Sequence, residues 1–414
     1  MTGRGLRIVG LADTDSYVKW AAALLGSLPE GSDAELLIID TPLVVSPQQE
    51  EAALARSGLD RSRVRRVGFA QLADVLSAAR PDAVLVAARG PLVRVLARAV
   101  AELEPRPVLV SGLPGISIPA TTAALIHRTQ CDLFVLHSTR EVREFTHLAR
   151  RRGLSQRFAL SRLPFAVRGG ATQPAPGDGT DLVFASQAKV PAERSDRMRV
   201  ARLLLEAALA DPSRRVVIKE RGLAGEHQTH RQRHSIADLL AKIAPPPPNL
   251  VVSTAPMGKA LDTAAGLVTV SSTAAIEAVA RGIPVIALDS FGVSDELINQ
   301  VFVGSGLLAS EEAVVTRDFR HPTREWLRRN YFHDPAEDDW TERVAELVAQ
   351  RRAGELPPKP ARLRRGGRLR DAWERKLAFG SRDRSLLGLV VLIVGVPMRI
   401  LVRPFARLRL RAAA

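Results

Sequence analysis

Short apolar runs alternate with helix-like segments along the first half of the chain. The runs are rich in Val, Leu and Ile, which is typical of strands buried on both faces of a parallel sheet. In the segments between them, apolar residues recur at the spacing of a helix that packs on a sheet. This predicts βαβ units with right-handed crossovers. We predict strands at 6–12, 35–40, 82–88, 107–112 and 132–137, and helices at Tyr17–Ser27, Pro47–Ser57, Gln71–Ala79, Pro91–Glu102 and Arg140–Arg152.

The alternation restarts after RGGATQPAPGDGT (Arg168–Thr180), whose Gly, Pro and polar residues predict a linker. Strands are then predicted at 181–185, 214–220, 249–253, 266–270 and 284–288, and helices at Ala192–Ala210, near Ser235–Ile243 and over Thr323–Arg352. The pattern predicts two α/β domains facing a central cleft, with ligands at the carboxyl ends of the strands. The expected segments are 1–167 (first domain), 168–180 (linker), 181–320 (second domain), 321–355 (closing helices) and 356–414 (tail).

Charge is concentrated at the C-terminus. Of the net charge of +15, a balance of +12 lies between Leu356 and Ala414, which leaves +3 for residues 1–355. A basic tail favours an anionic partner, either lipid headgroups or nucleic acid. The single cysteine, Cys131, excludes an intramolecular disulfide and fits a reducing cytoplasm. The first residues have no long apolar run, so we expect no secretory signal peptide.

One segment of the second half, VTVSSTAAIEAVARGIPVIAL (Val268–Leu288), combines a strand end with candidate ligand groups. Ser271, Ser272 and Thr273 occupy the turn before a predicted helix at Ala274–Arg281, which ends at Gly282. The free N–H groups of a helix N-terminus suit a phosphate, and Glu277 in the first turn suits a ribose diol. In the alternative interpretation, the hydroxyls only cap the helix and Glu277 is solvated.

Two other strand ends of this half carry polar residues. Lys219 and Arg221 end one strand and match phosphate oxygens, while glycines after them allow a ligand to approach the backbone. The remaining candidates of these two corners are Glu226, His227 and His230 in the loop after Arg221, and Ser186, Gln187 and Lys189 after the strand DLVFA. The loop after Arg221 could also be merely solvated. Its histidines and Glu226 could bind zinc, but the neighbouring cations oppose a metal, so we expect none.

In the first half, Asp13 and Asp15 lie in the first βα turn, in LADTDSYVKW. One of them could be a general base, which needs a suitable pKa and reach to a hydroxyl proton; Asp15 or Ser16 could instead cap the helix. The Gly/Pro-rich loop within Ser111–Asp132 could shape an acceptor site, with His127 and Arg128 nearby, although we expect His127 to be a structural histidine.

These motifs resemble a known superfamily. IEAVARGIPVIAL resembles the donor half of GT-B glycosyltransferases, and the SST before it is similar to the turn of lipid-A disaccharide synthases and capsule-polysaccharide transferases. VIKERGLAGEHQTH is similar to the Lys-x-His-Pro region of the capsule enzymes, but ERG replaces the His-Pro. DTDSYVKW, GLPGISIP, KERGLAGEHQTH and VSSTAAIEA together look closest to uncharacterised actinobacterial glycosyltransferases.

The resemblance implies a GT-B fold with the acceptor bound by the first domain and the donor nucleotide by the second. It implies that Ser272 and Thr273 contact the diphosphate, that Glu277 binds the ribose, and that Lys219 and Arg221 stabilise the leaving diphosphate. It implies metal-independent transfer from a nucleotide-sugar substrate without a cofactor, to a lipid-linked or polysaccharide acceptor of the cell envelope. A nucleotide-sugar 2-epimerase and a non-catalytic nucleotide-sugar-binding protein on a membrane are the alternatives.

The tail contains an uncharged apolar stretch, Ser385–Met398, followed by arginines. The stretch is shorter than the ~20 residues of a spanning helix, which predicts a monotopic anchor on anionic lipid. Near absence of aromatic residues argues against nucleic-acid binding. We therefore expect a cytoplasmic protein that lies peripherally or monotopically on the inner face of the plasma membrane; a packed C-terminal helix is the alternative.

Overall fold

The computed structural model describes residues 5–55, 57–166, 179–188, 190–220, 234–358 and 367–395. The chain divides into two compact units. The first comprises Met1–Gly112, Ala123–Phe134 and Thr341–Ala414, and the second comprises Leu113–Thr122 and Val135–Trp340. Each unit is described by itself below. The predicted linker at 168–180 falls almost wholly outside the described residues.

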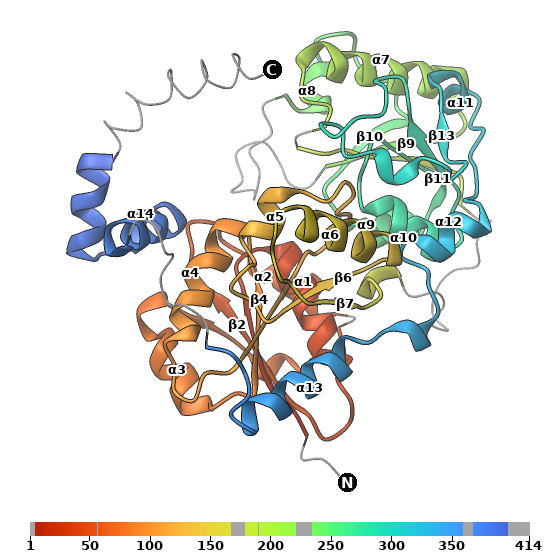
Figure 1. Ribbon diagram of the computed structural model, residues 1–414. Helices are drawn as coiled ribbons and strands as arrows, with labels where there is room; N and C mark the ends of the chain where they lie inside the picture. Colours follow the sequence, from red (N-terminus) through yellow and green to blue (C-terminus); the bar gives the residue numbers. More distant parts are fainter. Residues whose placement is uncertain are drawn as a thin grey trace. The chain divides into compact units, whose positions relative to one another are not determined.

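The first sheet has seven strands in the order β3-β2-β1-β4-β5-β6-β7. Figure 1 labels β2, β4, β6 and β7 among them. The neighbours β1–β2, β2–β3, β1–β4 and β4–β5 pair in parallel, as predicted for βαβ units. The elements are β1 (Arg7–Ala12), α1 (Asp15–Gly26), β2 (Asp33–Ile39), α2 (Pro47–Leu54), β3 (Val64–Val67), α3 (Leu72–Ala79), β4 (Ala83–Ala87), α4 (Gly90–Ala101), β5 (Val108–Gly112), α5 (Thr122–Ile126), β6 (Leu133–Leu136), α6 (Thr139–Arg151) and β7 (Phe158–Leu160).

Successive residues of β1 point to opposite faces of the first sheet and so belong to different layers of the first unit's core. Val9 and Leu11 pack with residues of α3 and α4 on one face of the sheet. Gly10 faces α1, where a Cβ atom would lie 2.8 Å from Leu25 Cδ1, so glycine allows this helix to pack closely. Burial on both faces explains why these strands are continuous apolar runs.

The second sheet has six strands in the order β10-β9-β8-β11-β12-β13. Its neighbours also pair in parallel. The elements are β8 (Asp181–Ala185), α7 (Arg194–Ala210), β9 (Val216–Lys219), α8 (Ile236–Leu240), β10 (Leu250–Ser253), α9 (Met257–Leu261), β11 (Ala264–Thr269), α10 (Ala274–Ala280), β12 (Val285–Leu288), β13 (Leu308–Ala309) and α11 (Glu311–Val315).

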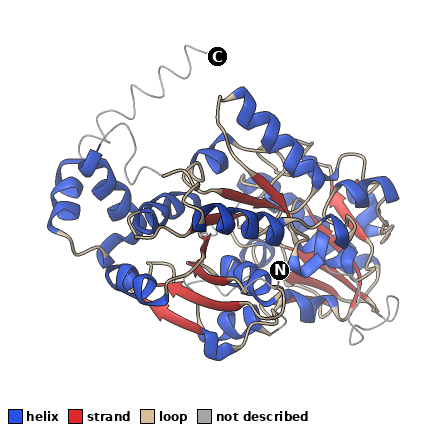
Figure 2. Ribbon diagram, turned by 60° about the horizontal axis from the view of Figure 1, so that its bottom comes forward, coloured by secondary structure: helices blue, strands red, loops and turns tan. Residues whose placement is uncertain are grey.

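Both faces of this sheet are also covered (Figure 2). Val183 and Ala185 of β8 pack with α9 and α10, while Leu182 and Phe184 pack with α7, α8 and α11. The alternation along one strand therefore builds two core layers, and the carboxyl ends of the parallel strands share one edge of the sheet.

The C-terminal helices differ from the prediction in one place. Thr323–Arg352 was expected to be helical, but α12 (Arg324–Arg329) and α13 (Trp340–Arg352) are separate helices. The chain leaves α12 at Tyr331, which has φ of +64° and a fully buried ring. Its hydroxyl donates to Glu141 Oε1 at 2.7 Å, a contact between distant segments that has no local sequence signal.

Part of the predicted tail belongs to the core of the first unit. Residues 367–379 form α14 (Gly367–Phe379), and Phe379 packs against Phe69 with ring centroids 4.7 Å apart. A 3₁₀ turn, η6 (Gly380–Arg382), leads to a further helix at 386–395. In the part of the chain that the structure describes, no helix is long and apolar enough to cross a bilayer.

Candidate functional site

Three loops of the second unit meet at the carboxyl edge of its sheet. They follow β8, β9 and β11, which are neighbours in the order β9-β8-β11. The Ser186 backbone N–H donates to Lys219 O at 3.1 Å, which joins the first two loops. The Gln187 side chain joins the first and third, because its Oε1 accepts from Ser271 N at 3.0 Å and from Ser271 Oγ at 3.2 Å. The structure thus brings together the three corners that the sequence predicted.

A buried arginine that the sequence reasoning missed holds the loop after β8. Arg197, in the first turn of α7, is almost fully buried. Its guanidinium donates to Gln187 O at 2.6 Å, to Pro191 O at 2.8 Å and to His234 O at 3.0 Å. Burial lowers the pKa of Arg197, while the nearby Glu220 opposes that shift. Arg197 therefore fixes the backbone that presents Gln187 to Ser271.

Lys219 and Glu220 form a buried charged end to β9. Lys219 Nζ donates to the carbonyl oxygen of Glu220, and Glu220 Oε1 accepts from Ser235 Oγ at 2.9 Å. Lys219 was predicted but Glu220 was not, because an acidic residue between two cations is also typical of a solvated loop. The other candidates of these corners, Lys189, Arg221, Glu226, His227 and His230, lie outside the described residues.

The turn before α10 is locally hydrogen-bonded. Ser272 N donates to Thr269 Oγ1 at 3.1 Å, and Ser272 Oγ accepts from Ala274 N at 3.2 Å. Thr273 occupies the N-cap position but its hydroxyl makes no capping bond. Instead Thr273 Oγ1 accepts from Ile116 N at 3.5 Å, and a Cβ atom on Gly115 would lie only 2.7 Å from it. The loop at 113–118 therefore packs directly on this turn.

Glu277 is not the solvated residue of the alternative interpretation, since its side chain is only 13% exposed. Its Oε1 lies 3.2 Å from Arg281 Nη2. Arg281 also donates to Gly258 O at 3.0 Å and pairs with Asp262 at 2.9 Å. Glu277 thus has a fixed position near the N-terminus of α10.

Buried polar residues hold the 113–118 loop in place. Glu141, fully buried in α6, accepts from Ser117 N at 3.0 Å, from His137 N at 2.8 Å and from the Tyr331 hydroxyl. Burial raises the pKa of Tyr331 well above its usual range and Glu141 adds to this, so the phenol keeps its proton and donates. The ring of His137 lies 2.9 Å from Leu113 O. This cluster was not predicted, because it joins three segments, at 113–117, 137–141 and 331, that are far apart in sequence.

In the first unit, Asp13 is fully buried just after β1. Its Oδ2 lies 2.7 Å from Arg89 Nε, and its Oδ1 accepts from Arg89 N at 3.3 Å. Burial raises the pKa of Asp13, and the charge and hydrogen bonds of Arg89 oppose that shift. Asp15 begins α1 and accepts from Ser16 Oγ at 3.4 Å. The capping role considered for Asp15 or Ser16 is wrong, because the N-cap residue is Thr14 and no side-chain cap bond forms.

Two residues near the predicted acceptor loop have structural contacts. Arg128 is buried and donates to Gly112 O, Ala124 O and the Tyr17 hydroxyl, at 3.1–3.2 Å. The ring of His127 packs on Gly90, where a Cβ atom would lie 2.4 Å from Nδ1. Burial lowers the pKa of His127, and Arg94 and Arg128 add to the shift. Arg128 therefore ties the end of β5 to α1 and α5.

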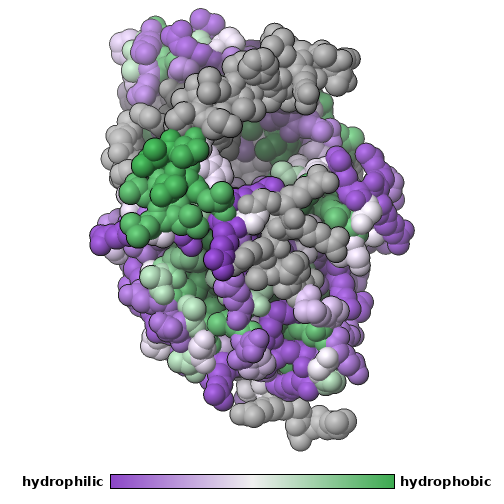
Figure 3. Space-filling view, turned by 60° about the vertical axis from the view of Figure 1, so that its left-hand side comes forward, coloured by the Kyte–Doolittle hydropathy of each residue, from purple (hydrophilic) through white to green (hydrophobic). Residues whose placement is uncertain are grey.

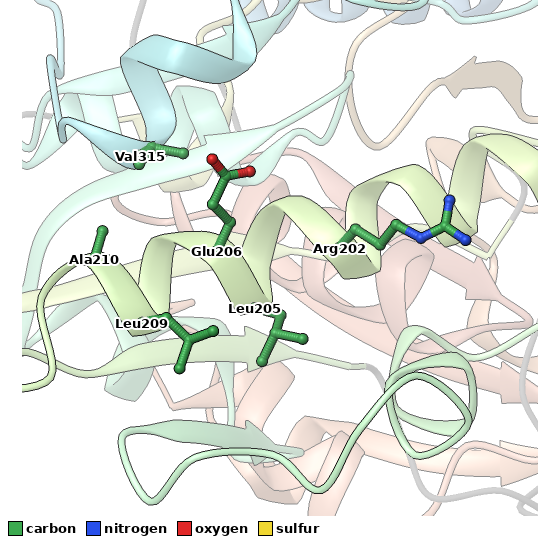
Figure 4. A pocket seen from close by; sticks show the side chains of 6 residues that line it. All are labelled: Arg202, Leu205, Glu206, Leu209, Ala210 and Val315. Atoms are coloured by element: carbon green, nitrogen blue, oxygen red, sulfur yellow. The ribbon is translucent and has the colours of Figure 1, made fainter.

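A shallow groove lies elsewhere, along the C-terminal half of α7 (Figure 4). Glu206 rises from the helix toward Val315, and the wall also includes Arg202, Leu205 and Leu209. Because α7 runs antiparallel to the strands beside it, this half lies toward their amino ends, away from the candidate site. Among the described residues, no group of three His, Cys, Asp or Glu side chains could hold a metal.

Residues 8–347 match the family described as "Putative glycosyltransferase (DUF6716)". The chain belongs to this family. No curated protein matches the sequence. Two similar solved structures are the Staphylococcus aureus MnaA–UDP co-structure and the Methanocaldococcus jannaschii UDP-GlcNAc 2-epimerase in complex with UDP-GlcNAc and UDP.

The S. aureus structure is 12% identical, with a TM-score of 0.53, and the match covers 86% of this chain and 100% of that chain. The M. jannaschii structure is also 12% identical, with a TM-score of 0.55, and the match covers 83% and 99%. At this identity the likeness concerns the fold. With the two parallel sheets it confirms the predicted GT-B architecture.

Proposed function

We propose that this protein transfers a sugar from a nucleotide-sugar donor to an envelope-polysaccharide or lipid-linked acceptor at the inner membrane face. The observation that carries the proposal is the meeting of Gln187, Lys219 and Ser271 at one edge of the second sheet. Ligands of α/β sheets bind at this edge. Membership of a glycosyltransferase family and a fold shared with UDP-bound proteins support a nucleotide-sugar as that ligand.

In this proposal the second unit binds the donor. Ser272 and Thr273 contact the diphosphate with the backbone at the start of α10, and Glu277 binds the ribose. Gln187 and Ser186 shape the neighbouring wall. The loop candidates Lys189, Arg221, Glu226, His227 and His230 complete the site in the sequence-based proposal.

In the donor site, Lys219 would stabilise the leaving diphosphate. Negative charge develops on the leaving diphosphate as the glycosidic bond breaks, so a fixed cation favours the transition state over the ground state. Burial reduces dielectric screening of that cation. Lys219, with Arg221, would thus replace a metal, and we propose transfer without a metal or cofactor. Asp13 or Asp15 would accept the proton from the acceptor hydroxyl.

Nucleotide binding is tested by calorimetric titration with UDP-, GDP- and CMP-sugars. We expect Glu277→Ala and Lys219→Met to weaken binding of the preferred donor at least about tenfold, the effect of one lost charged hydrogen bond. Glu206→Ala and Lys242→Met, at exposed positions, are matched controls that should bind normally. Unchanged affinity in both site variants, with thermal unfolding confirming that they fold, would refute the donor assignment.

A nucleotide-sugar 2-epimerase is the second candidate, because a similar solved structure is a UDP-GlcNAc 2-epimerase. The two reactions differ in what they require. An epimerase converts one nucleotide-sugar into another without an acceptor, whereas a transferase releases the free nucleotide as a product when an acceptor is present. NMR of UDP-GlcNAc incubated with the protein alone, and then with envelope acceptors, distinguishes them. Binding with neither reaction would indicate a non-catalytic binding protein.

The C-terminal region supports a lipid-linked acceptor. The basic residues of 356–414 and the apolar stretch Ser385–Met398 fit an anionic membrane surface. Deleting all of 356–414 would also remove Phe379 from the core of the first unit. Truncation after Arg384 is therefore the better test, and we expect it to move the protein from the membrane fraction to the soluble fraction.

A further inference from the structure

The helix at 386–395 presents a continuous aliphatic stripe to solvent. Leu386, Leu389, Val390, Ile393 and Val394 are 50–83% exposed, and we call them the docking face. They follow the spacing i, i+3, i+4, i+7 and i+8, so they share one side of the helix. In Figure 3 a strongly hydrophobic patch stands out on this side of the molecule. Isolated exposed leucines are ordinary, but a contiguous aliphatic patch marks an interaction surface.

The opposite side of the same helix is packed and contains glycine. A Cβ atom on Gly395 would lie 2.5 Å from the ring of Trp373 in α14. One on Gly388 would lie 2.6 Å from Asp383 Oδ2. Val391, between these glycines, is buried. Gly395 therefore allows the helix to lie close to α14, Gly388 allows it to lie close to Asp383 and Ser385, and together they determine which side remains exposed.

Ion pairs fix α14 to α4 within the first unit. Arg98 of α4, whose side chain is 6% exposed, lies 2.8 Å from Asp371 and 2.6 Å from Glu374. Arg94 lies 3.3 Å from Glu374. Burial raises the pKa of Glu374, but its bonds and charge interactions with the arginines outweigh this and leave the pKa below its usual value. The docking face is thus held by a folded part of the unit.

The charges around the docking face select its partner. Residues 367–395 contain six Lys or Arg and three Asp or Glu, and the sequence that follows adds five Arg and no acid. A second copy of the chain would bring two basic segments together, which is unfavourable. An anionic bilayer provides an apolar interior for the aliphatic stripe and negative headgroups for the flanking cations. The described part of this helix, residues 386–395, is too short to span a bilayer, and its stripe of aliphatic residues on one side suits a helix that lies in the plane of the interface.

We propose that the docking face inserts into the interfacial layer of an anionic bilayer and holds the first unit at the membrane in one orientation. This names the lipid-contacting residues of the membrane association included in the proposed function. It does not depend on sugar transfer, because vesicle binding is measured without any nucleotide or acceptor.

The test is co-sedimentation of the full-length protein with phosphatidylcholine vesicles that contain or lack phosphatidylglycerol. We expect binding to vesicles with phosphatidylglycerol, weakened by salt, and at least tenfold lower partitioning for the double variant Leu389→Ser/Ile393→Ser. The matched control is Leu209→Ser, an equally exposed leucine on α7, which should bind as the unsubstituted protein does. Nucleotide affinity, measured on the same variants, separates loss of docking from failure of the donor site.

Two results would overturn the proposal. One is equal vesicle binding by the double variant and the unsubstituted protein. The other is a dimer in the absence of lipid that the double variant converts to a monomer, since the face would then be a contact between copies. Thermal unfolding shows whether each variant is folded. If Leu389→Ser/Ile393→Ser does not fold, Val390→Ser/Val394→Ser tests the same stripe independently.

Discussion

At the scale of single residues, the site combines buried charges with short local contacts. Lys219 and Glu220 are both buried at the end of β9, where an isolated charge would be costly. Each has a partner in the structure: the Glu220 carbonyl for Lys219, and the Ser235 hydroxyl for Glu220. Breaking such an arrangement costs more than its net contribution to stability, because the remaining charge is left buried. A site of this kind suits a reaction in which charge develops on a bound phosphate.

Asp13 provides a prediction with a defined pH dependence. Burial raises the pKa of this carboxyl group from 3.8, with Arg89 opposing. A general base acts as the carboxylate, so activity should rise with pH through this elevated pKa. Over the same range the folded protein holds a proton that the unfolded chain has lost, so this group's contribution to stability falls as pH rises.

Asp13→Asn should therefore lower kcat by about 10²–10⁴-fold, the usual contribution of a general base, with donor affinity unchanged. The pH–rate profile should lose its acid limb, and unfolding measured against pH should lose the matching stability change. Asp74→Asn, at an exposed position in α3, is the control. A large loss of kcat in Asp15→Asn but not in Asp13→Asn would assign the base to the other predicted aspartate.

At the scale of elements, the packing of the 113–118 loop on the start of α10 can be tested sterically. In Gly115→Ala the new Cβ atom would lie 2.7 Å from Thr273 Oγ1, closer than real contacts allow. We expect a loss of about 1–3 kcal/mol in the free energy of unfolding, typical of overpacking. Thr273→Ala removes the obstructing oxygen and leaves a 3.6 Å contact to its Cβ.

The double variant Gly115→Ala/Thr273→Ala should thus lose less stability than the two single variants together, as urea unfolding of all four proteins would show. Strictly additive losses would mean that the loop and α10 do not touch in solution. Stability is the readout, because Thr273→Ala is also expected to weaken donor binding by itself.

The elements that the sequence predicted are those whose signal is local. Buried strands such as β4 and β12 are uninterrupted apolar runs, and α10 begins and ends where Thr273 and Gly282 indicate. Strand β3 was missed because Arg65 and Arg66 make it polar, as suits a strand at the sheet's edge.

The residues of the candidate site likewise divide into those with a local sequence signal and those without one. Gln187, Lys219 and Ser271 were predictable because each lies at or just after the carboxyl end of a predicted strand, and neighbouring parallel strands bring such residues together. Arg197, Glu141 and Tyr331 were not, because they follow no strand end and bond mainly to loop backbone or, for Tyr331 and Glu141, to each other across 190 residues. No pattern along the chain indicates that Tyr331 ends α12 in order to reach Glu141. Contacts of this kind depend on tertiary packing alone.

At the scale of the whole molecule, charge and apolar surface are concentrated in one region. The last 59 residues carry nearly all of the net positive charge, and the exposed docking face lies among them. The rest of the chain is close to neutral. Because ion pairs hold α14 to α4, the described residues 367–395 belong to a folded unit that would meet the membrane as a rigid body.

This arrangement predicts different kinetics for two kinds of acceptor. An enzyme held at a bilayer meets a lipid-linked acceptor at a high effective concentration, and that advantage disappears when docking is lost. Leu389→Ser/Ile393→Ser should raise KM for an acceptor embedded in phosphatidylglycerol vesicles by about tenfold or more. The kcat/KM for a short-chain, water-soluble analogue should stay unchanged, because the docking face is outside the catalytic machinery. Leu209→Ser should alter neither value. Equal impairment with both acceptors would mean that the helix at 386–395 supports the fold of the first unit rather than its access to the membrane.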